Sequence, residues 1–196
     1  MYSIILKMHD IFFRYLNLYG NISQHDTDII RNNTSVRCVK EGEILLHKNR
    51  QAQEMFFICE GILKILVTNS KGVDIVYFFR SENQLCTLLD SFINHIIAEQ
   101  SVVAACNATL ITFTRAQFST ICNSVPFFND MIHKIMQQEL INKVKIRSEY
   151  LGEDATTRYH NFLSRQPEIA TRVSMQDIAS YLEITPQSFS RIRRNV

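Results

Sequence analysis

Residues 174–194 read SMQDIASYLEITPQSFSRIRR, and this stretch predicts two helices joined by a short turn. Ser174 suits the N-cap of a first helix that continues to about Leu182, and Thr185-Pro186 suit the start of a second one. Apolar residues at helical spacing give the helices inward faces, formed by Ile178, Ala179 and Leu182 in the first and by Phe189 and Ile192 in the second. Such a pair is typical of the helix-turn-helix arrangement.

Upstream, residues 126–151 predict one long helix that Pro126 opens and Gly152 ends. At about 1.5 Å per residue it is roughly 35 to 40 Å long. Its apolar residues recur at three- and four-residue steps and form one stripe, made of Phe128, Ile132, Ile135, Met136, Leu140 and Val144. The stripe can pack on the preceding domain or on a second copy of the helix, and we favour the dimer. Polar residues near mid-helix predict a seam weaker than a regular coiled coil, namely Gln138, Glu139 and Asn142.

Residues 36–113 show a pattern of short β-rich runs separated by turn residues, which predicts several short strands. The β-rich runs are 55–59, 62–67, 73–79 and 101–105. This spacing predicts a sandwich or barrel, with hairpin turns at Gly61 and Gly72, where a positive φ is easiest. Helices are expected on either side, at 24–32 with Ser23 as the cap and at 115–122.

The composition of the 196 residues, 46% hydrophobic and 20% charged, is typical of a globular domain. A net charge of +2 does not by itself indicate nucleic-acid binding. No apolar run is long enough to span a membrane, and charged residues interrupt residues 1–19 before a signal peptide can form, so we expect a cytoplasmic protein without a membrane partner.

The chain has five widely spaced cysteines, namely Cys38, Cys59, Cys86, Cys106 and Cys122. Their spacing favours reduced thiols packed in the core over disulfides or a zinc site, and a redox-sensing thiol is the alternative.

The helix-turn-helix stretch closely resembles the C-terminal domain of the Crp/Fnr family of bacterial regulators, with Glu183 where the family commonly has a turn glycine. Two further segments extend this resemblance. Residues 56–65, FFICEGILKI, look like the signature hairpin of the family's cyclic-nucleotide-binding β-roll, and residues 41–45, EGEIL, match the strand before it. The long helix is similar to the family's dimerisation helix, so the resemblance covers about 36–194 in the family's order.

The resemblance implies an α+β protein of three parts. Residues 1–125 would form a sensor domain, a jelly-roll-like double-stranded β-helix (the β-roll) with flanking helices. Residues 126–152 would form the dimerisation helix, and residues 153–196 a helix-turn-helix domain of the winged-helix type. The sequence ends two residues after Arg194, where many relatives continue into a wing hairpin, and leaves open whether the wing is naturally absent or truncated.

In the family, the second helix of the motif lies in the DNA major groove. The resemblance therefore implies that double-stranded DNA contacts Thr185, Pro186, Gln187, Ser188, Ser190, Arg191, Arg193 and Arg194. Gln187 and Arg191 are four residues apart and share a face, and they can read adenine and guanine respectively. Arg193 and Arg194 suit phosphates. The alternative is that the arginines form a solvated basic end that only complements the helix dipole.

Nucleotide-binding members hold the cyclic phosphate and ribose with a Gly-Glu pair and, some ten residues on, an Arg-Ser or Arg-Thr pair. A gapless alignment on Phe92 and Ala104 places Thr87-Leu88 and Ala98-Glu99 at these positions. Losing the arginine and adding the charge of Glu99 should each cost about 1–3 kcal/mol of binding free energy. Cyclic AMP is thus not the expected effector; an uncharged or hydrophobic ligand, or an empty collapsed pocket, is expected instead.

These features predict a homodimeric, sequence-specific transcription regulator with double-stranded DNA as partner, an unidentified small-molecule effector and RNA polymerase as a further candidate partner. We expect no enzyme, catalytic residue, cofactor or metal site, because there is no P-loop, GxSxG or HExxH motif and the six histidines are scattered. The alternative is a small-molecule or redox sensor that acts through protein–protein contacts. Salt-dependent binding to duplex DNA distinguishes the two hypotheses, because it is expected of a DNA-binding regulator and not of a sensor that acts through protein contacts.

Overall fold

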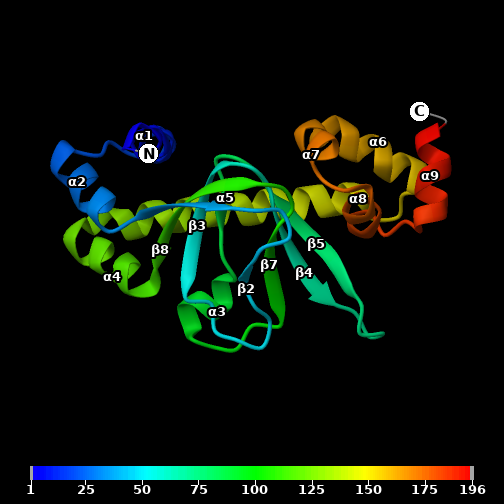
Figure 1. Ribbon diagram of the computed structural model, residues 1–196, viewed down its shortest axis with the longest axis horizontal. Helices are drawn as coiled ribbons and strands as arrows, with labels where there is room; N and C mark the ends of the chain where they lie inside the picture. Colours follow the sequence, from blue (N-terminus) through cyan, green and yellow to red (C-terminus); the bar gives the residue numbers. More distant parts are fainter. Residues whose placement is uncertain (1, 195–196) are drawn as a thin grey trace.

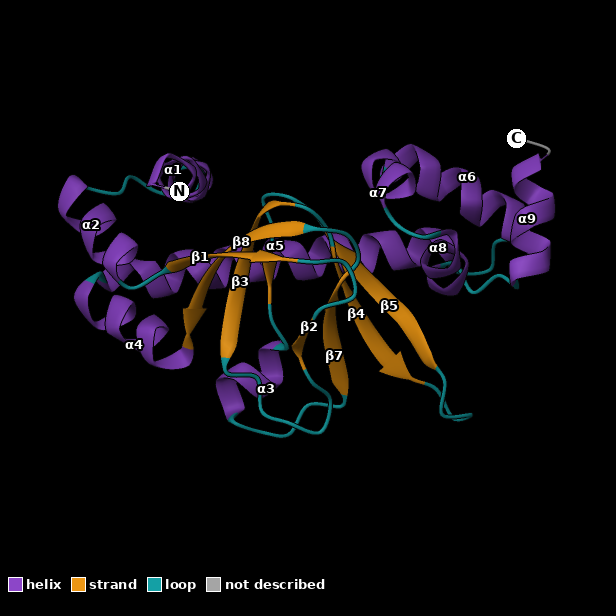
Figure 2. Cartoon of the chain, viewed as in Figure 1, coloured by secondary structure: helices purple, strands orange, loops and turns teal. Residues whose placement is uncertain are grey.

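Two four-stranded antiparallel sheets form the centre of the protein, and helices extend from both ends (Figures 1 and 2). The computed structural model describes residues 2–194. One sheet has the strand order β1-β8-β3-β6 and the other β2-β7-β4-β5. The strands are β1 (Ser35–Val39), β2 (Ile44–Leu46), β3 (Glu54–Glu60), β4 (Leu63–Thr68), β5 (Asp74–Arg80), β6 (Leu85–Cys86), β7 (Gln100–Ala104) and β8 (Ala108–Thr114). The predicted α+β β-roll is therefore confirmed, and each predicted strand run falls on an observed strand.

The two predicted hairpin turns have different outcomes. Gly72 closes the β4–β5 hairpin with φ +77°, as expected. Gly61 also has a positive φ, of +105°, but it does not close a hairpin, because β3 and β4 belong to different sheets. The backbone crosses between the sheets there and passes so close to the start of β8 that a side chain has no room. The hairpin expected over residues 56–65 was therefore wrong, although the glycine requirement was right.

Strand β3 is buried on both faces, because a helix covers the side of its sheet that faces away from the sandwich. This helix, α1 (Tyr2–Leu16), was not predicted. Phe12 and Tyr15 pack on the ring of Phe57 with centroid separations of 4.8 and 5.0 Å. The apolar character of residues 1–19 therefore reflects a core-facing helix.

The other helices next to the sheets follow local capping signals. Helix α2 (Gln24–Asn32) begins at Ser23, which forms a capping box with Asp26. Helix α4 (Arg115–Ser124) begins at Thr114, which forms the same arrangement with Gln117. Both helices were predicted. The short α3 (Leu89–Asn94) between β6 and β7 was not.

Helix α5 (Pro126–Tyr150) runs along the β-roll and joins the two helical ends of the protein (Figure 1). Its apolar stripe is divided between two environments. Phe128, Ile132 and Ile135 are buried against the protein's own core, whereas Leu140 and Val144 are 60% and 61% exposed. Only the C-terminal half of the predicted stripe is therefore free for a partner.

Glu139 on α5 faces the β-roll and is buried, so it does not belong to the exposed half of the stripe. Its Oε1 accepts a hydrogen bond from the Leu85 amide at 3.0 Å, and its Oε2 lies 3.1 Å from Arg80 Nη1. Burial raises the pKa of the Glu139 carboxyl, and Arg80 offsets only part of that effect. This polar residue thus attaches α5 to β5 and β6.

Four helices follow α5, namely α6 (Ala155–Arg165), α7 (Pro167–Arg172), α8 (Met175–Tyr181) and α9 (Pro186–Arg194). Helices α8 and α9 correspond to the two predicted helices of residues 174–194. No strand follows β8 within residues 2–194, so a wing is not part of the described structure. In that same part of the chain, no helix combines the length and apolarity needed to cross a bilayer.

The substitution Gly61→Ala should be markedly more harmful than Gly72→Ala. A Cβ at position 61 would collide with Ala108 and lie 2.7 Å from the Asn107 carbonyl oxygen, whereas a Cβ at position 72 meets nothing within 4 Å. We expect a loss of about 3–5 kcal/mol for Gly61→Ala, from overpacking added to the left-handed backbone, and about 1–2 kcal/mol for Gly72→Ala. Urea unfolding measures both, and equal losses would contradict the close approach at Gly61.

Candidate nucleic-acid interface and effector pocket

Helices α8 and α9 pack together through the residues that the sequence pattern placed inward. Ser174 caps α8, with its Oγ accepting from the Asp177 amide at 3.1 Å. The inward-facing side chains are buried, comprising Ile178, Ala179, Tyr181 and Leu182 of the first segment and Ile184, Phe189 and Ile192 of the second. Glu183, in the turn, has φ +57°, a left-handed backbone conformation that a glycine would adopt without strain.

The opposite face of α9 is exposed and basic. Gln187, Ser188, Arg191 and Arg194 together line a shallow groove of about 500 Å³. Thr185 caps the helix by accepting from the Ser188 amide at 3.2 Å. Arg193 points to another side, where it contacts Met175. Among the described residues, no carboxylate lies within ion-pair distance of the three arginines at positions 191, 193 and 194.

All the remaining residues predicted to contact DNA are on the accessible side of the motif. Pro186 and Ser190 are exposed, as is Thr185. The arrangement thus presents short polar side chains and arginines on one helix whose inward face, Phe189 and Ile192, is occupied by packing. Chemically, this surface offers hydrogen-bond donors and positive charge, and no carboxylate of residues 2–194 forms an ion pair with its arginines.

Helix α8 lies on β5, which is the edge strand of its sheet. Lys64 Nζ on β4 forms an ion pair of 2.6 Å with Asp177 Oδ1, and the two side chains are largely buried. The free amide of Val76 on β5 donates to Ser180 Oγ at 2.9 Å. These contacts join the helix-turn-helix pair to the β-roll, and nothing in the local sequence indicates them.

Aromatic packing completes this junction. The Tyr181 ring on α8 is only 1% exposed and lies edge to face against Phe79 at 5.1 Å, Phe162 at 5.8 Å and Tyr150 at 6.0 Å. These partners come from β5, α6 and α5. One side chain therefore contacts three of the elements that meet at the junction.

The four residues predicted as a degenerate effector pocket do come together. Thr87, Leu88, Ala98 and Glu99 line one cavity of about 690 Å³ between the β-roll and α5. Leu88 and Ala98 are buried and apolar, so these two positions offer no charge to a ligand. The cavity is therefore open in this conformation and not collapsed.

The charges around this cavity are unevenly distributed. Glu99 and Asp90 line it from the β-roll, while Lys143 lines it from α5. Arg80 also lines it, but Glu139 neutralises Arg80. An anion in this cavity would thus meet the carboxylates of Glu99 and Asp90, and the one guanidinium of the lining, Arg80, is already paired with Glu139.

The cysteines do not form a site in the described residues, where no group of three His, Cys, Asp or Glu side chains is arranged to hold a metal ion. Burial raises the pKa of the Cys59 and Cys86 thiols to about 12, which keeps them in the unreactive thiol form. Cys38 is the exposed thiol of the chain's five.

Comparisons with known proteins agree with this geometry. Residues 36–125 match the family model described as cyclic nucleotide-binding domain. Among solved structures, a Crp/Fnr-family protein from Eubacterium rectale is similar, with a TM-score of 0.72 and 16% identity over 93% of this chain and 87% of that one. No curated protein sequence matches the chain.

Two further solved structures share the architecture. One is FixK2 from Bradyrhizobium japonicum, with a TM-score of 0.70 and 14% identity over 83% of each chain. The other is the c-di-GMP-responsive global regulator CLP of Xanthomonas campestris, with a TM-score of 0.68 and 12% identity over 88% of this chain and 91% of that one. Residues 36–125 thus match the domain family described as cyclic nucleotide-binding domain, and the chain shares the fold of these three solved structures.

Proposed function

We propose that this protein is a cytoplasmic, homodimeric, sequence-specific DNA-binding transcription regulator of the Crp/Fnr type, and not an enzyme. Its sensor domain would span residues 1–125, its dimerisation helix 126–152 and its DNA-binding domain 153–196. The observation that carries the proposal is the exposed face of α9, where Gln187 and Arg191 lie together and three arginines have no acidic partner among the described residues.

The chemistry of this face suits duplex DNA better than a protein surface. A planar guanidinium can donate two hydrogen bonds to the acceptors of guanine, and a glutamine amide can pair with adenine. Arg191 and Gln187 share the groove on α9 and can serve these roles. Arg193 and Arg194 suit phosphates, contacts that position a protein on DNA without reading its sequence.

The exposed half of the α5 stripe supports a homodimer. Leu140 and Val144 are 60% and 61% exposed, and their spacing of four residues places them on one face of α5. A second copy would cover these residues and give the paired helix-turn-helix elements that two DNA half-sites require.

The effector is proposed not to be a cyclic nucleotide. Buried Leu88 and Ala98, together with the carboxylate of Glu99, stand where a cyclic phosphate would need a positive charge. The ligand of the cavity would therefore have another chemistry.

Replacing both Leu140 and Val144 by Glu should convert the dimer to a monomer, because like charges would face each other across the seam. Light scattering on the unaltered protein should return about twice the chain mass of 22.8 kDa, and on the double variant about that mass itself. Lys145→Glu, an exposed change on the same helix away from the stripe, is the control and should remain dimeric. A monomeric unaltered protein at micromolar concentration would reject the dimer.

Calorimetric titration with cyclic AMP or cyclic GMP should give no saturable binding with a Kd below about 1 mM. The physical reason is the lost charge-assisted contact and the added repulsion from Glu99. Micromolar binding would show that the phosphate is held elsewhere and would overturn the gapless assignment of these residues.

Arg191→Ala and Arg194→Ala should have different effects on DNA binding. Arg191→Ala should cost about 1–3 kcal/mol on the operator and relax the preference at one base pair, whereas Arg194→Ala should weaken binding to all sequences and reduce the salt slope by roughly one. Operators selected from random duplexes, titrated at several salt concentrations, provide the measurement. Equal losses on operator and random DNA would remove Arg191 as a base reader. An absence of salt-dependent duplex binding would favour a sensor that works through protein contacts.

A further inference from the structure

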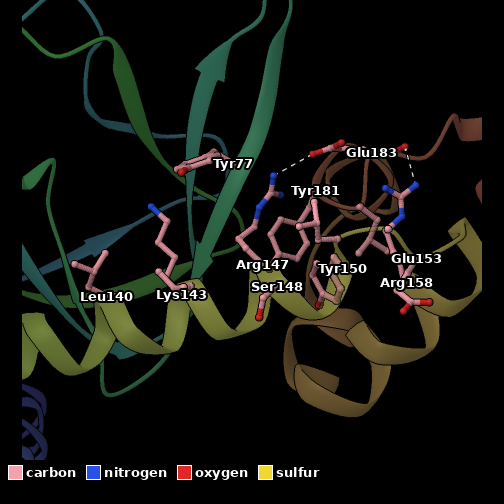
Figure 3. A pocket seen from close by; sticks show the side chains of 14 residues that line it. Tyr77, Leu140, Lys143, Arg147, Ser148, Tyr150, Glu153, Arg158, Tyr181 and Glu183 are labelled. Atoms are coloured by element: carbon pink, nitrogen blue, oxygen red, sulfur yellow. Dashed lines mark hydrogen bonds and ion pairs between the residues drawn. The ribbon is translucent and has the colours of Figure 1, made fainter.

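A second cleft, of about 570 Å³, opens where α5, β5 and the α8–α9 turn meet (Figure 3). We call it the junction cleft. It is distinct from the effector pocket, although Tyr77, Leu140 and Lys143 contribute to the lining of both. Its volume is in the range of small-molecule sites, roughly 300–1,000 Å³.

Lys143 supplies a positive charge that the described residues leave uncompensated. Its Nζ lies over the Tyr77 ring, 4.3 Å from the centroid, and no carboxylate is within ion-pair distance. The neighbouring cations differ, because Arg80 pairs with Glu139 and Arg147 pairs with Glu183. Burial and the nearby arginines lower the pKa of Lys143, so the ammonium is held at an energetic cost that a counter-ion would relieve.

The wall of the junction cleft also holds buried hydrogen-bond donors that lack acceptors. The Nε of Arg158, which lines the cleft, is buried and has no hydrogen-bond partner among the described residues. The hydroxyls of Tyr150 and Tyr181 are buried in the same wall and interact with each other. Only one of the two hydroxyls can donate to the other, so one O–H and the Arg158 Nε–H are left for an acceptor-bearing ligand or ordered water.

The remaining surface of the cleft is mostly apolar. It is formed by Leu140, Val144, Leu151 and Leu182, together with the tyrosine rings. The acidic residues that line it are Glu183, which is tied to Arg147, and the exposed Glu153. A ligand with a single negative charge and an apolar body would match one free ammonium beside these walls.

We propose that the junction cleft binds a small monocarboxylate with an apolar body, whose carboxylate pairs with Lys143 while its body packs on Leu182 and the neighbouring apolar side chains. The carboxylate would also compete with Glu183 for Arg147, whose Nη2 lies 3.2 Å from Glu183 Oε1. In the proposed dimer, Leu140 and Val144 form the rim of the cleft, next to the second copy.

The competition gives the ligand a route to the DNA-binding helices. Glu183 is the turn residue between α8 and α9, and its carbonyl also accepts from Arg158 at 3.4 Å. A ligand whose carboxylate binds Arg147 would break the ion pair between Arg147 and Glu183, which joins α5 to this turn. This regulatory consequence, and the place of the second copy beside Leu140 and Val144, rest on the proposed function, whereas the pairing of a carboxylate with Lys143 does not.

The test is calorimetric titration of the full-length chain, without DNA, using butyrate, hexanoate and octanoate, with 1-hexanol as the uncharged counterpart of hexanoate. We expect saturable binding of hexanoate, an affinity that rises about fourfold per added methylene group, and at least tenfold weaker binding of 1-hexanol. Because DNA is absent, a failure of the proposed DNA binding leaves this result unchanged.

Four variants test the site. Because Lys143 lines both cavities and Glu183 lines only the junction cleft, the Glu183 variant is the one that assigns the binding to the cleft. Lys143→Met keeps the apolar stem and should weaken hexanoate binding at least tenfold, while Lys143→Arg keeps the charge and should retain binding within a few fold. Glu183→Gln frees Arg147 and should strengthen binding several-fold. Lys145→Met, exposed on the same helix and outside the cleft, should change nothing. The proposal is overturned if no carboxylate binds, if hexanoate and hexanol bind equally, or if Lys143→Met binds hexanoate as well as the unaltered protein.

Discussion

The docking of α8 on the edge strand β5 is the contact on which the arrangement of the rest depends. An edge strand exposes unpaired amides, and here the amide of Val76 is satisfied by Ser180 from the helix. The ion pair of Lys64 with Asp177 is largely removed from water, where breaking it would leave one charge uncompensated. Through these two contacts and the packing of Tyr181, the orientation of α9 is determined by a strand of the β-roll, although more than a hundred residues separate them in the chain.

Helix α5 links this junction to the sensor domain by a different kind of interaction. Its N-terminal half is attached by apolar burial, its middle by the Arg80–Glu139 pair, and its C-terminal part by contacts around Tyr150. The same helix lines both the effector pocket and the junction cleft. A ligand in either cavity therefore touches the helix that also carries the exposed Leu140 and Val144.

Much of this architecture could be predicted because its causes are local. The caps at Ser23 and Ser174, Pro126 at the start of α5 and the inward faces of α8 and α9 each follow from short-range hydrogen bonding and helical period. The meeting of Thr87, Leu88, Ala98 and Glu99 in one cavity was also predicted, whereas Arg80 and Lys143 join its lining only through folding. Helix α1 was missed because its apolar face was considered only as a targeting signal, and α7 because six residues carry little periodicity.

The sequence by itself determined the elements, the positive φ at Gly61 and the residues on the outer face of α9, because backbone sterics and side-chain period act within a few residues. Only the tertiary structure decided that β3 and β4 lie in different sheets and that Glu139 faces the core while Leu140 does not. It also decided that Lys143, Tyr181 and Glu183 meet in one cleft. These outcomes depend on which distant surfaces exclude water together, and burial is not a property of any single segment of the chain.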